Sequence, residues 1–258
     1  MSYSSLTNKY IPASPKNYSK GRAGKKVIKI TPHHMAGNLS IEACGKLWQQ
    51  PARKASSNYG IGTDGRIACY VDEENRSWCS SSADNDNVAI TVEIANDGGA
   101  PNWHVSDKAV NSFVKLAIDI CKRYGIKSIN YTGNKNGNMT EHRYFTATLC
   151  PGPYLHNNMA NIAKKINAGL APAPSDGFLP AKGYWTRYDK DARVNQLSKF
   201  MRQNFPSYTP ASALGPIYGD NLYKAIKEFQ RRTKLSASGN TDKATYAMLQ
   251  KYGFKYKK

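Results

Sequence analysis

The sequence lacks any apolar run long enough to cross a bilayer, and it is short of acidic residues. No stretch approaches the roughly 18 consecutive apolar residues of a transmembrane helix, and residues 1–14 contain no apolar core of a Sec-type signal peptide. Only 18 Asp and Glu accompany 37 Lys and Arg in 258 residues, which gives a formal net charge of +19. We therefore expect a polyanionic partner: nucleic acid, an anionic membrane surface or an anionic cell-wall polymer.

Cysteine is also scarce, and its spacing excludes a dense disulfide scaffold. The five cysteines are odd in number and scattered, with no Cys-x-x-Cys pair; they are Cys44, Cys69, Cys79, Cys121 and Cys150. Small domains held by disulfides carry cysteine more densely and in even number. With 40% hydrophobic and 21% charged residues, the chain can bury a packed core. All cysteines except Cys150 are expected there as small apolar side chains.

A Pro- and Ala-rich stretch divides the chain. Residues 170–180 read LAPAPSDGFLP, with three prolines among small residues and no Lys or Arg, which is typical of a linker with polyproline character. We predict a larger domain over residues 1–169 and a smaller one over residues 181–258. The smaller one holds 16 Lys and Arg against 5 Asp and Glu, a net charge of +11.

Strands and helices interleave in residues 1–169. Alternating or β-branched segments predict strands over residues 27–31, 66–71 and 88–94. Thr63-Asp64-Gly65 has the turn chemistry of a hairpin that joins 59–62 to 66–71. Apolar spacing predicts helices over residues 40–48, 107–124 and 159–168. The longest of them is capped by Ser106 and ended by Gly125. This order predicts an α/β fold with a mixed central sheet flanked by helices.

Residues 181–258 show helical spacing without long alternation. Three apolar stripes predict short helices over residues 194–201, 222–229 and 241–252. Asp220 or Asn221 is the predicted N-cap of the second helix, and Thr241 is that of the third. We therefore expect a small helical C-terminal domain.

Candidate metal ligands concentrate in two segments. His33 and His34 follow the apolar segment VIKIT, and His142 precedes Cys150 by eight residues in EHRYFTATLCPGP. A group at a strand end is held rigidly while the loops leave it accessible. Two imidazole nitrogens and one thiolate suit Zn²⁺, and a set of three ligands leaves the fourth position for water. Because consecutive strand residues point to opposite faces, only one of His33 and His34 is expected in the site.

Glu93 is the candidate general base. It lies within the apolar strand segment AITVEI. The pattern leaves two interpretations open. In one, the strand alternates and Thr91, Glu93 and Ala95 face solvent. In the other, the carboxyl is buried beside a metal, and burial raises its pKa toward the working range of a general base.

These segments together resemble the type 2 N-acetylmuramoyl-L-alanine amidases, zinc enzymes of phage endolysins and bacterial autolysins that are related to the peptidoglycan recognition proteins. The resemblance covers about residues 25–168 and depends on ITPHH, TVEIAND and EHRYFTATLCPGPYL in matching order. It implies that His33, His142 and Cys150 bind Zn²⁺ and that Glu93 is catalytic. It also implies hydrolysis of the amide bond between N-acetylmuramic acid and L-alanine.

One position departs from the pattern of some relatives. Those relatives carry a Lys two residues before the metal-binding Cys, where it helps to polarise the scissile carbonyl; here this residue is Thr148. Either the Thr148 hydroxyl donates a hydrogen bond to the carbonyl oxygen or the metal polarises the carbonyl alone.

The C-terminal segment resembles the helical peptidoglycan-binding module. The residues that carry this resemblance are Ala225, Ile226, Phe229, Gln230, Gly239, Thr245 and Leu249. A catalytic domain, a linker and a basic wall-binding domain form an endolysin layout. It implies Gram-positive peptidoglycan and anionic wall polymers as partners, with no nucleic acid and no membrane insertion. The family also implies that the protein stays in the host cytoplasm until a holin releases it to the wall.

Two other functions stay open from the sequence. A non-catalytic peptidoglycan recognition protein has the same fold, but such proteins usually lack the metal-binding cysteine, which is present here as Cys150. A basic nucleic-acid-binding protein would present Lys227, Arg231 and Lys234 on one helix face. That function leaves the His, Glu and Cys set unexplained.

Overall fold

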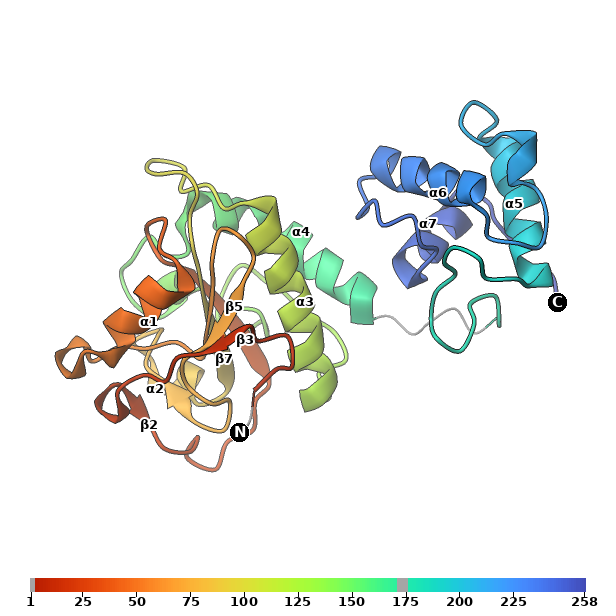
Figure 1. Cartoon of the computed structure of the whole chain (residues 1–258). Helices are drawn as coiled ribbons and strands as arrows, with labels where there is room; N and C mark the ends of the chain where they lie inside the picture. The colour runs from red at the N-terminus through yellow and green to blue at the C-terminus, as the bar shows by residue number, and fades with distance from the viewer. Residues whose placement is uncertain (1–2, 171–175) are drawn as a thin grey trace. The chain divides into compact units, whose positions relative to one another are not determined.

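The computed structural model describes residues 3–170 and 176–258, which divide into two compact units, Met1–Leu170 and Ala171–Lys258 (Figure 1). Each unit has hydrophobic clusters of its own. Residues 171–175 of the expected linker lie outside the described residues, and Leu170 is the last residue of a helix. In the described part of the chain, no helix combines the length and apolar character needed to cross a membrane.

A five-stranded mixed sheet forms the centre of the first unit, as the sequence predicted. Its order is β1 (Lys9–Tyr10), β5 (Ile67–Cys69), β4 (Tyr59–Ile61), β7 (Ala89–Ile94) and β3 (Lys29–His34). Strands β4 and β5 form the expected antiparallel hairpin, and the other neighbouring pairs are parallel. Strand β3 extends past the predicted end at residue 31 because it pairs with β7 along its whole length.

Helices cover both faces of this sheet. Helices α3 (Asp107–Tyr124) and α4 (Gly152–Leu170) pack on one face, and α1 (Ile41–Gln49) lies on the other (Figure 1). Helix α3 has its predicted bounds because Ser106 accepts a hydrogen bond from Ala109 N and Gly125 ends the helix at φ 70°.

Helix α4 begins seven residues before the predicted residue 159. The Pro-Gly-Pro sequence cannot continue a helix, but proline fits the first helical turn, where its missing N–H has no partner to lose. The remaining elements of this unit are short. They are β2 (Tyr18–Ser19), which pairs with β6 (Arg76–Ser77), α2 (Ala83–Asp86) and the 3₁₀ turns Pro15–Asn17, Pro51–Arg53 and His142–Tyr144.

One face of β7 is apolar and the other carries polar side chains. Ile90, Val92 and Ile94 point into the apolar core under α3 and α4. Thr91 and Glu93 point to the opposite face. Thr91 is fully buried there and bonds with Ser77 and Asn58. The prediction of a solvent-facing polar side is therefore wrong for Thr91, because neighbouring polar side chains cover it.

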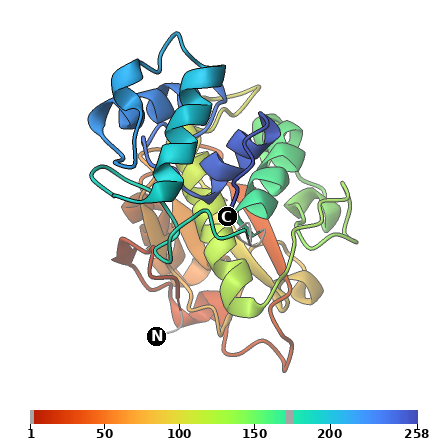
Figure 2. The same cartoon turned by 90° about the vertical axis from the view of Figure 1, so that its right-hand side faces the viewer.

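Among the described residues of the second unit, three helices surround the core, and they are drawn in blue in Figure 2. They are α5 (Ala192–Asn204), α6 (Asp220–Arg232) and α7 (Lys243–Lys251), with a 3₁₀ turn at Ala211–Ala213. Two predicted caps are wrong. Gly219 precedes α6, so Asp220 is its first helical residue. Asp242 caps α7 by accepting from Thr245 N, whereas Thr241 is buried and bonds with Tyr218.

Candidate metal and catalytic site

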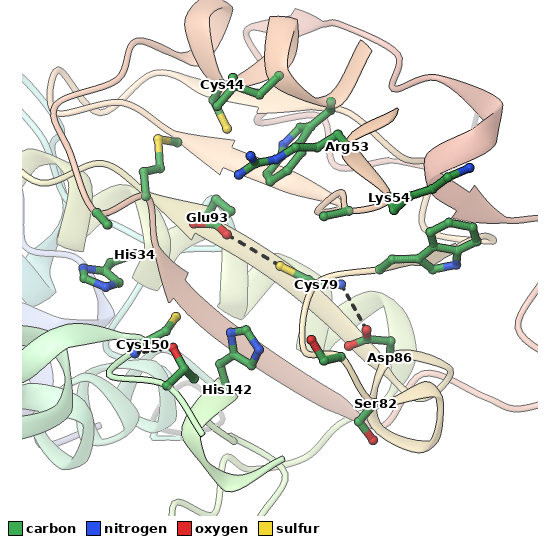
Figure 3. Close-up of a pocket in the computed structure, with 18 of the residues that line it drawn as sticks. His34, Cys44, Arg53, Lys54, Cys79, Ser82, Asp86, Glu93, His142 and Cys150 are labelled. Atoms are coloured by element: carbon green, nitrogen blue, oxygen red, sulfur yellow. Dashed lines mark hydrogen bonds between the residues drawn. The ribbon is translucent and has the colours of Figure 1, made fainter. Parts of the chain in front are cut away.

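A cavity of about 640 Å³ opens on the polar face of the sheet (Figure 3). One wall comes from α1 and the turn after it, including Trp48 and Arg53. Glu93 comes from β7, and His142 and Cys150 come from the segment between α3 and α4. Residues from three distant parts of the sequence therefore meet in one groove.

Three side chains that could hold a metal ion converge beside this cavity. One ligand atom each from His33, His142 and Cys150 lies within 4.8 Å of the others. Cys150 Sγ is 3.4 Å from His33 Nδ1, and the two imidazole centroids are 4.9 Å apart. His33 is only 1% exposed, because the end of β3 holds it against β7.

A buried glutamate that the sequence analysis missed anchors the loop of His142. Glu141 directly precedes His142 and is 0% exposed. Its carboxylate accepts hydrogen bonds from Tyr131 Oη at 2.5 Å and pairs with His156 Nδ1 at 2.9 Å. Arg143 donates to the carbonyl oxygens of Leu149 and Cys150. These bonds tie both ends of the His142–Cys150 loop, and no local sequence pattern distinguishes such an anchor from a surface charge.

Electrostatics of the three side chains suit a metal ion. Burial, with His142 and His34 nearby, lowers the pKa of His33 well below its usual range, and burial also lowers the pKa of His142. Both imidazoles are therefore neutral near pH 7, as metal ligands must be. The Nε2 atoms of both are buried and have no hydrogen-bond partner. Burial raises the pKa of the Cys150 thiol, so metal binding there would release a proton.

Glu93 lies next to this donor set. It pairs with His33 in the register of β7 and β3, and its Oε2 atom is buried without a hydrogen-bond partner. Burial raises its pKa to about 8, although a hydrogen bond from Cys79 and the charge of Arg53 act in the other direction. Its neighbour on β4 is Gly60, where a side chain would collide with the Tyr70 ring. This glycine makes room for an aromatic ring beside the carboxyl.

Cys79 is not the small core residue that the sequence suggested. It lines the cavity, and its thiol donates to Glu93 Oε1 across 3.7 Å. Together with His33 and Glu93 it forms a second group of possible metal-binding atoms. Asp86 holds the loop in place by accepting from the backbone N–H groups of Cys79 and Ser80. All five cysteines are free thiols.

The other candidate site residues line the cavity or lie on the surface. His34 lines the cavity, where its ring meets Trp103 edge-on. Thr148 also lines the cavity, and its Oγ1 accepts from Cys150 N, which leaves its O–H able to donate. His104 pairs with Asp97 on the surface.

The fold of the chain is similar to that of several solved structures. The chain is similar to the Staphylococcus aureus hydrolase AmiA, with 20% identity and a TM-score of 0.50 over 66% of this chain and 85% of that one. It is also similar to PlyL (18% identity, TM-score 0.47, 62% and 97% covered). The amidase LysC from Clostridium intestinale gives 17% identity and a TM-score of 0.47, with 62% and 99% covered. No protein with a curated description matches the sequence.

Family models match both units of the chain. A peptidoglycan binding domain model matches residues 203–249, within the helical unit. The N-acetylmuramoyl-L-alanine amidase model matches residues 23–153, which make up just over half of the chain and contain the whole His, Glu and Cys constellation. This chain therefore belongs to the N-acetylmuramoyl-L-alanine amidase family, and peptidoglycan is its partner.

Proposed function

We propose that the chain is a zinc-dependent amidase that cleaves the bond between the lactyl group of N-acetylmuramic acid and L-alanine. One observation carries this proposal: two neutral imidazoles and a thiol converge within 4.8 Å beside a buried carboxyl of raised pKa. The residues His33, His142 and Cys150 would hold the metal, and Glu93 would move protons.

The donor set fits zinc better than a harder cation. Nitrogen and sulfur ligands are the ones that Zn²⁺ prefers, whereas Mg²⁺ and Ca²⁺ take oxygen ligands. Both imidazole Nε2 atoms are buried without partners, a state that costs free energy unless a ligand satisfies it. When bound, zinc supplies Lewis acidity, which makes a nearby water more acidic and the scissile carbonyl more electrophilic.

Glu93 supplies the proton transfers. Its carboxylate takes a proton from water as the water oxygen adds to the lactyl carbonyl carbon. The protonated Glu93 then gives that proton to the alanine nitrogen as the C–N bond breaks, which releases a neutral amine. Burial favours this role because, in the metal-free protein, it raises the pKa of Glu93 to about 8, toward the range that suits a general base near neutral pH.

Thr148 is the proposed second polarising group. Its Oγ1 already accepts a hydrogen bond from Cys150 N, which fixes the side chain at the cavity edge. Its hydroxyl proton can therefore point toward a substrate carbonyl oxygen. A neutral donor stabilises a developing oxyanion less than a charged one, so we assign Thr148 a supporting role.

The second unit is proposed to keep the enzyme on the wall. Its peptidoglycan-binding match and the net charge of +11 over residues 181–258 suit a polymer surface that carries anionic chains. Binding that depends on exposed charges weakens with salt. A catalytic unit followed by a wall-binding unit supports an endolysin of a Gram-positive host, held in the cytoplasm until a holin releases it.

Cleavage of purified Gram-positive walls, with and without a zinc chelator, tests this function. We expect free L-alanine amino groups to appear, to disappear with chelator and to return with added zinc, without new reducing sugars. New reducing ends would mean a glycosidase, and a different amine would mean an endopeptidase. Full cleavage in chelator would contradict the zinc assignment while leaving the amidase family intact.

A further inference from the structure

The helical unit contains a small aromatic pocket that the catalytic function does not use. It has a volume of about 250 Å³ and lies where the ends of α5, α6 and α7 meet. The lining residues that matter for a ligand are Phe205, Ser207, Tyr208, Phe229, Arg232 and Tyr252. Typical small-molecule sites span about 300–1,000 Å³, so this pocket suits a single ring with its substituents.

Four aromatic rings make its apolar surface. Phe205 stacks on Tyr208 at 5.7 Å and also meets Phe229 and Tyr252 at 5.2 and 5.8 Å between centroids. Phe229 is buried, whereas Tyr252 is 52% exposed. The pocket therefore extends from a buried ring to an exposed ring. Such a change from apolar to solvent-exposed surroundings suits an amphipathic ligand.

The wall of the pocket is fixed before any ligand binds. Arg202 donates to the carbonyl oxygens of Pro206 and Thr209, at 3.3 and 2.9 Å. The backbone N–H of Tyr208 donates to Phe205 O, which closes a turn. A pocket that is already ordered loses little conformational entropy on binding.

The polar groups of the pocket favour an uncharged ligand. Arg232 is the cation in the lining. It shares the Glu228 carboxylate with Arg231, each at 2.7 Å, and its guanidinium lies 4.8 Å over the Tyr208 ring. Among the described residues, none makes a hydrogen bond with the side-chain hydroxyls of Ser207, Tyr208 and Tyr252. Free hydroxyls at the rim of an aromatic pocket can bond to neutral polar groups of a ligand.

We propose that this pocket binds one N-acetylated amino sugar of the peptidoglycan glycan strand. A pyranose ring has apolar C–H faces that pack on an aromatic ring, and its hydroxyls reach the rim. The acetamido methyl would enter toward Phe205 and Phe229, and its carbonyl oxygen would accept from a tyrosine hydroxyl. This assignment rests on the proposed function in one respect, since it takes peptidoglycan as the partner of the helical unit.

Sedimentation of the full-length protein with walls stripped of anionic polymers tests the pocket. We expect Tyr252→Ala to weaken binding about tenfold or more, the effect of losing a central aromatic contact. Tyr252→Phe should keep most of the binding, because the ring remains. The matched control is Tyr188→Ala, which removes a tyrosine that is 73% exposed in the same unit but outside the pocket. Thermal melts establish that each variant is folded.

Competition with soluble fragments of peptidoglycan identifies the ligand of the pocket. The N-acetylglucosamine tetramer should displace the wild-type protein, and a soluble stem peptide should not. Wild-type binding by Tyr252→Ala and Tyr208→Ala, or displacement by the stem peptide alone, would overturn the assignment. Binding only to walls that keep their anionic polymers would also overturn it. Hydrolysis of a soluble muropeptide in the same samples reports on the amidase separately, so failure of one proposal can be told from failure of the other.

Discussion

The cavity over the sheet and the aromatic pocket of the helical unit differ in how their polar atoms are satisfied. The cavity over the sheet leaves His33 Nε2, His142 Nε2 and Glu93 Oε2 buried without partners. The pocket of the helical unit is lined by rings that pack on one another, and its free hydroxyls lie at its rim. Buried unpaired atoms cost stability, and the proposed metal and the proposed proton transfers would satisfy those at this cavity. A binding pocket does not require buried polar atoms without partners, so it can be formed by the same aromatic side chains that pack in the core.

Removing a proposed metal ligand is expected to have the largest effect. His142→Ala or Cys150→Ala should lose bound zinc and show no turnover above background, because two remaining ligands hold the ion too weakly. Metal content and amine release from walls measure this. The matched control is His104→Ala, which removes a surface histidine paired with Asp97. A zinc-free His142→Ala variant with wild-type turnover would remove the metal from the mechanism.

Replacing Glu93, the proposed general base, separates an effect on the reaction from an effect on metal binding. Glu93→Gln should lower kcat by about 10²–10⁴-fold, the usual contribution of a positioned acid–base group, while zinc content stays at the wild-type level. Glu42→Gln is the control, because Glu42 forms ion pairs with Arg66 and Lys9 at the surface. Retained turnover in Glu93→Gln would exclude this residue from proton transfer.

Deleting the helical unit tests whether the two cavities act separately. A chain that ends at Leu170 keeps its own cores. It should hydrolyse a soluble muropeptide within about twofold of the full-length rate but should cleave intact walls about tenfold more slowly, because tethering raises the local substrate concentration. An equal loss on both substrates would mean that the helical unit supports catalysis directly.

Cys79 is expected to be a positioning residue with a smaller effect. Its thiol donates to Glu93 Oε1, so Cys79→Ala should lower kcat by about three- to tenfold, the usual value of one hydrogen bond. Cys79→Ser also carries a donor and should restore most of the loss. Zinc content should stay unchanged in both variants. If serine fails to rescue while the protein stays folded and metal-bound, the role of Cys79 is packing.

The sequence predicted regular elements better than it predicted the neighbours of the site. Ser106 and Gly125 fixed the ends of α3 because caps are local signals. The start of α4 was missed because proline both ends and begins helices. Cys79 and Glu141 were missed for another reason. A thiol beside a carboxyl and a buried anchor of a loop arise from contacts between distant segments, and neither leaves a periodic pattern in the chain.

The stability that the protein loses by burying Glu93 should be measurable in chelator-treated protein. Burial raises the pKa of Glu93 to about 8, against about 4.3 in an unfolded chain. Between these values the folded state binds the proton more tightly, so the wild-type protein loses stability as the pH rises from about 5 to 8. The amide side chain in Glu93→Gln does not ionise, so this variant does not lose stability in that way as the pH rises. We therefore expect the Tm of Glu93→Gln to exceed that of the wild type by about 5 °C or more at pH 8 and by much less at pH 5.

The control variant Glu42→Gln should show no such gain in Tm. A Tm difference that is the same at both pH values would mean that Glu93 is charged in the metal-free protein and that burial does not tune it.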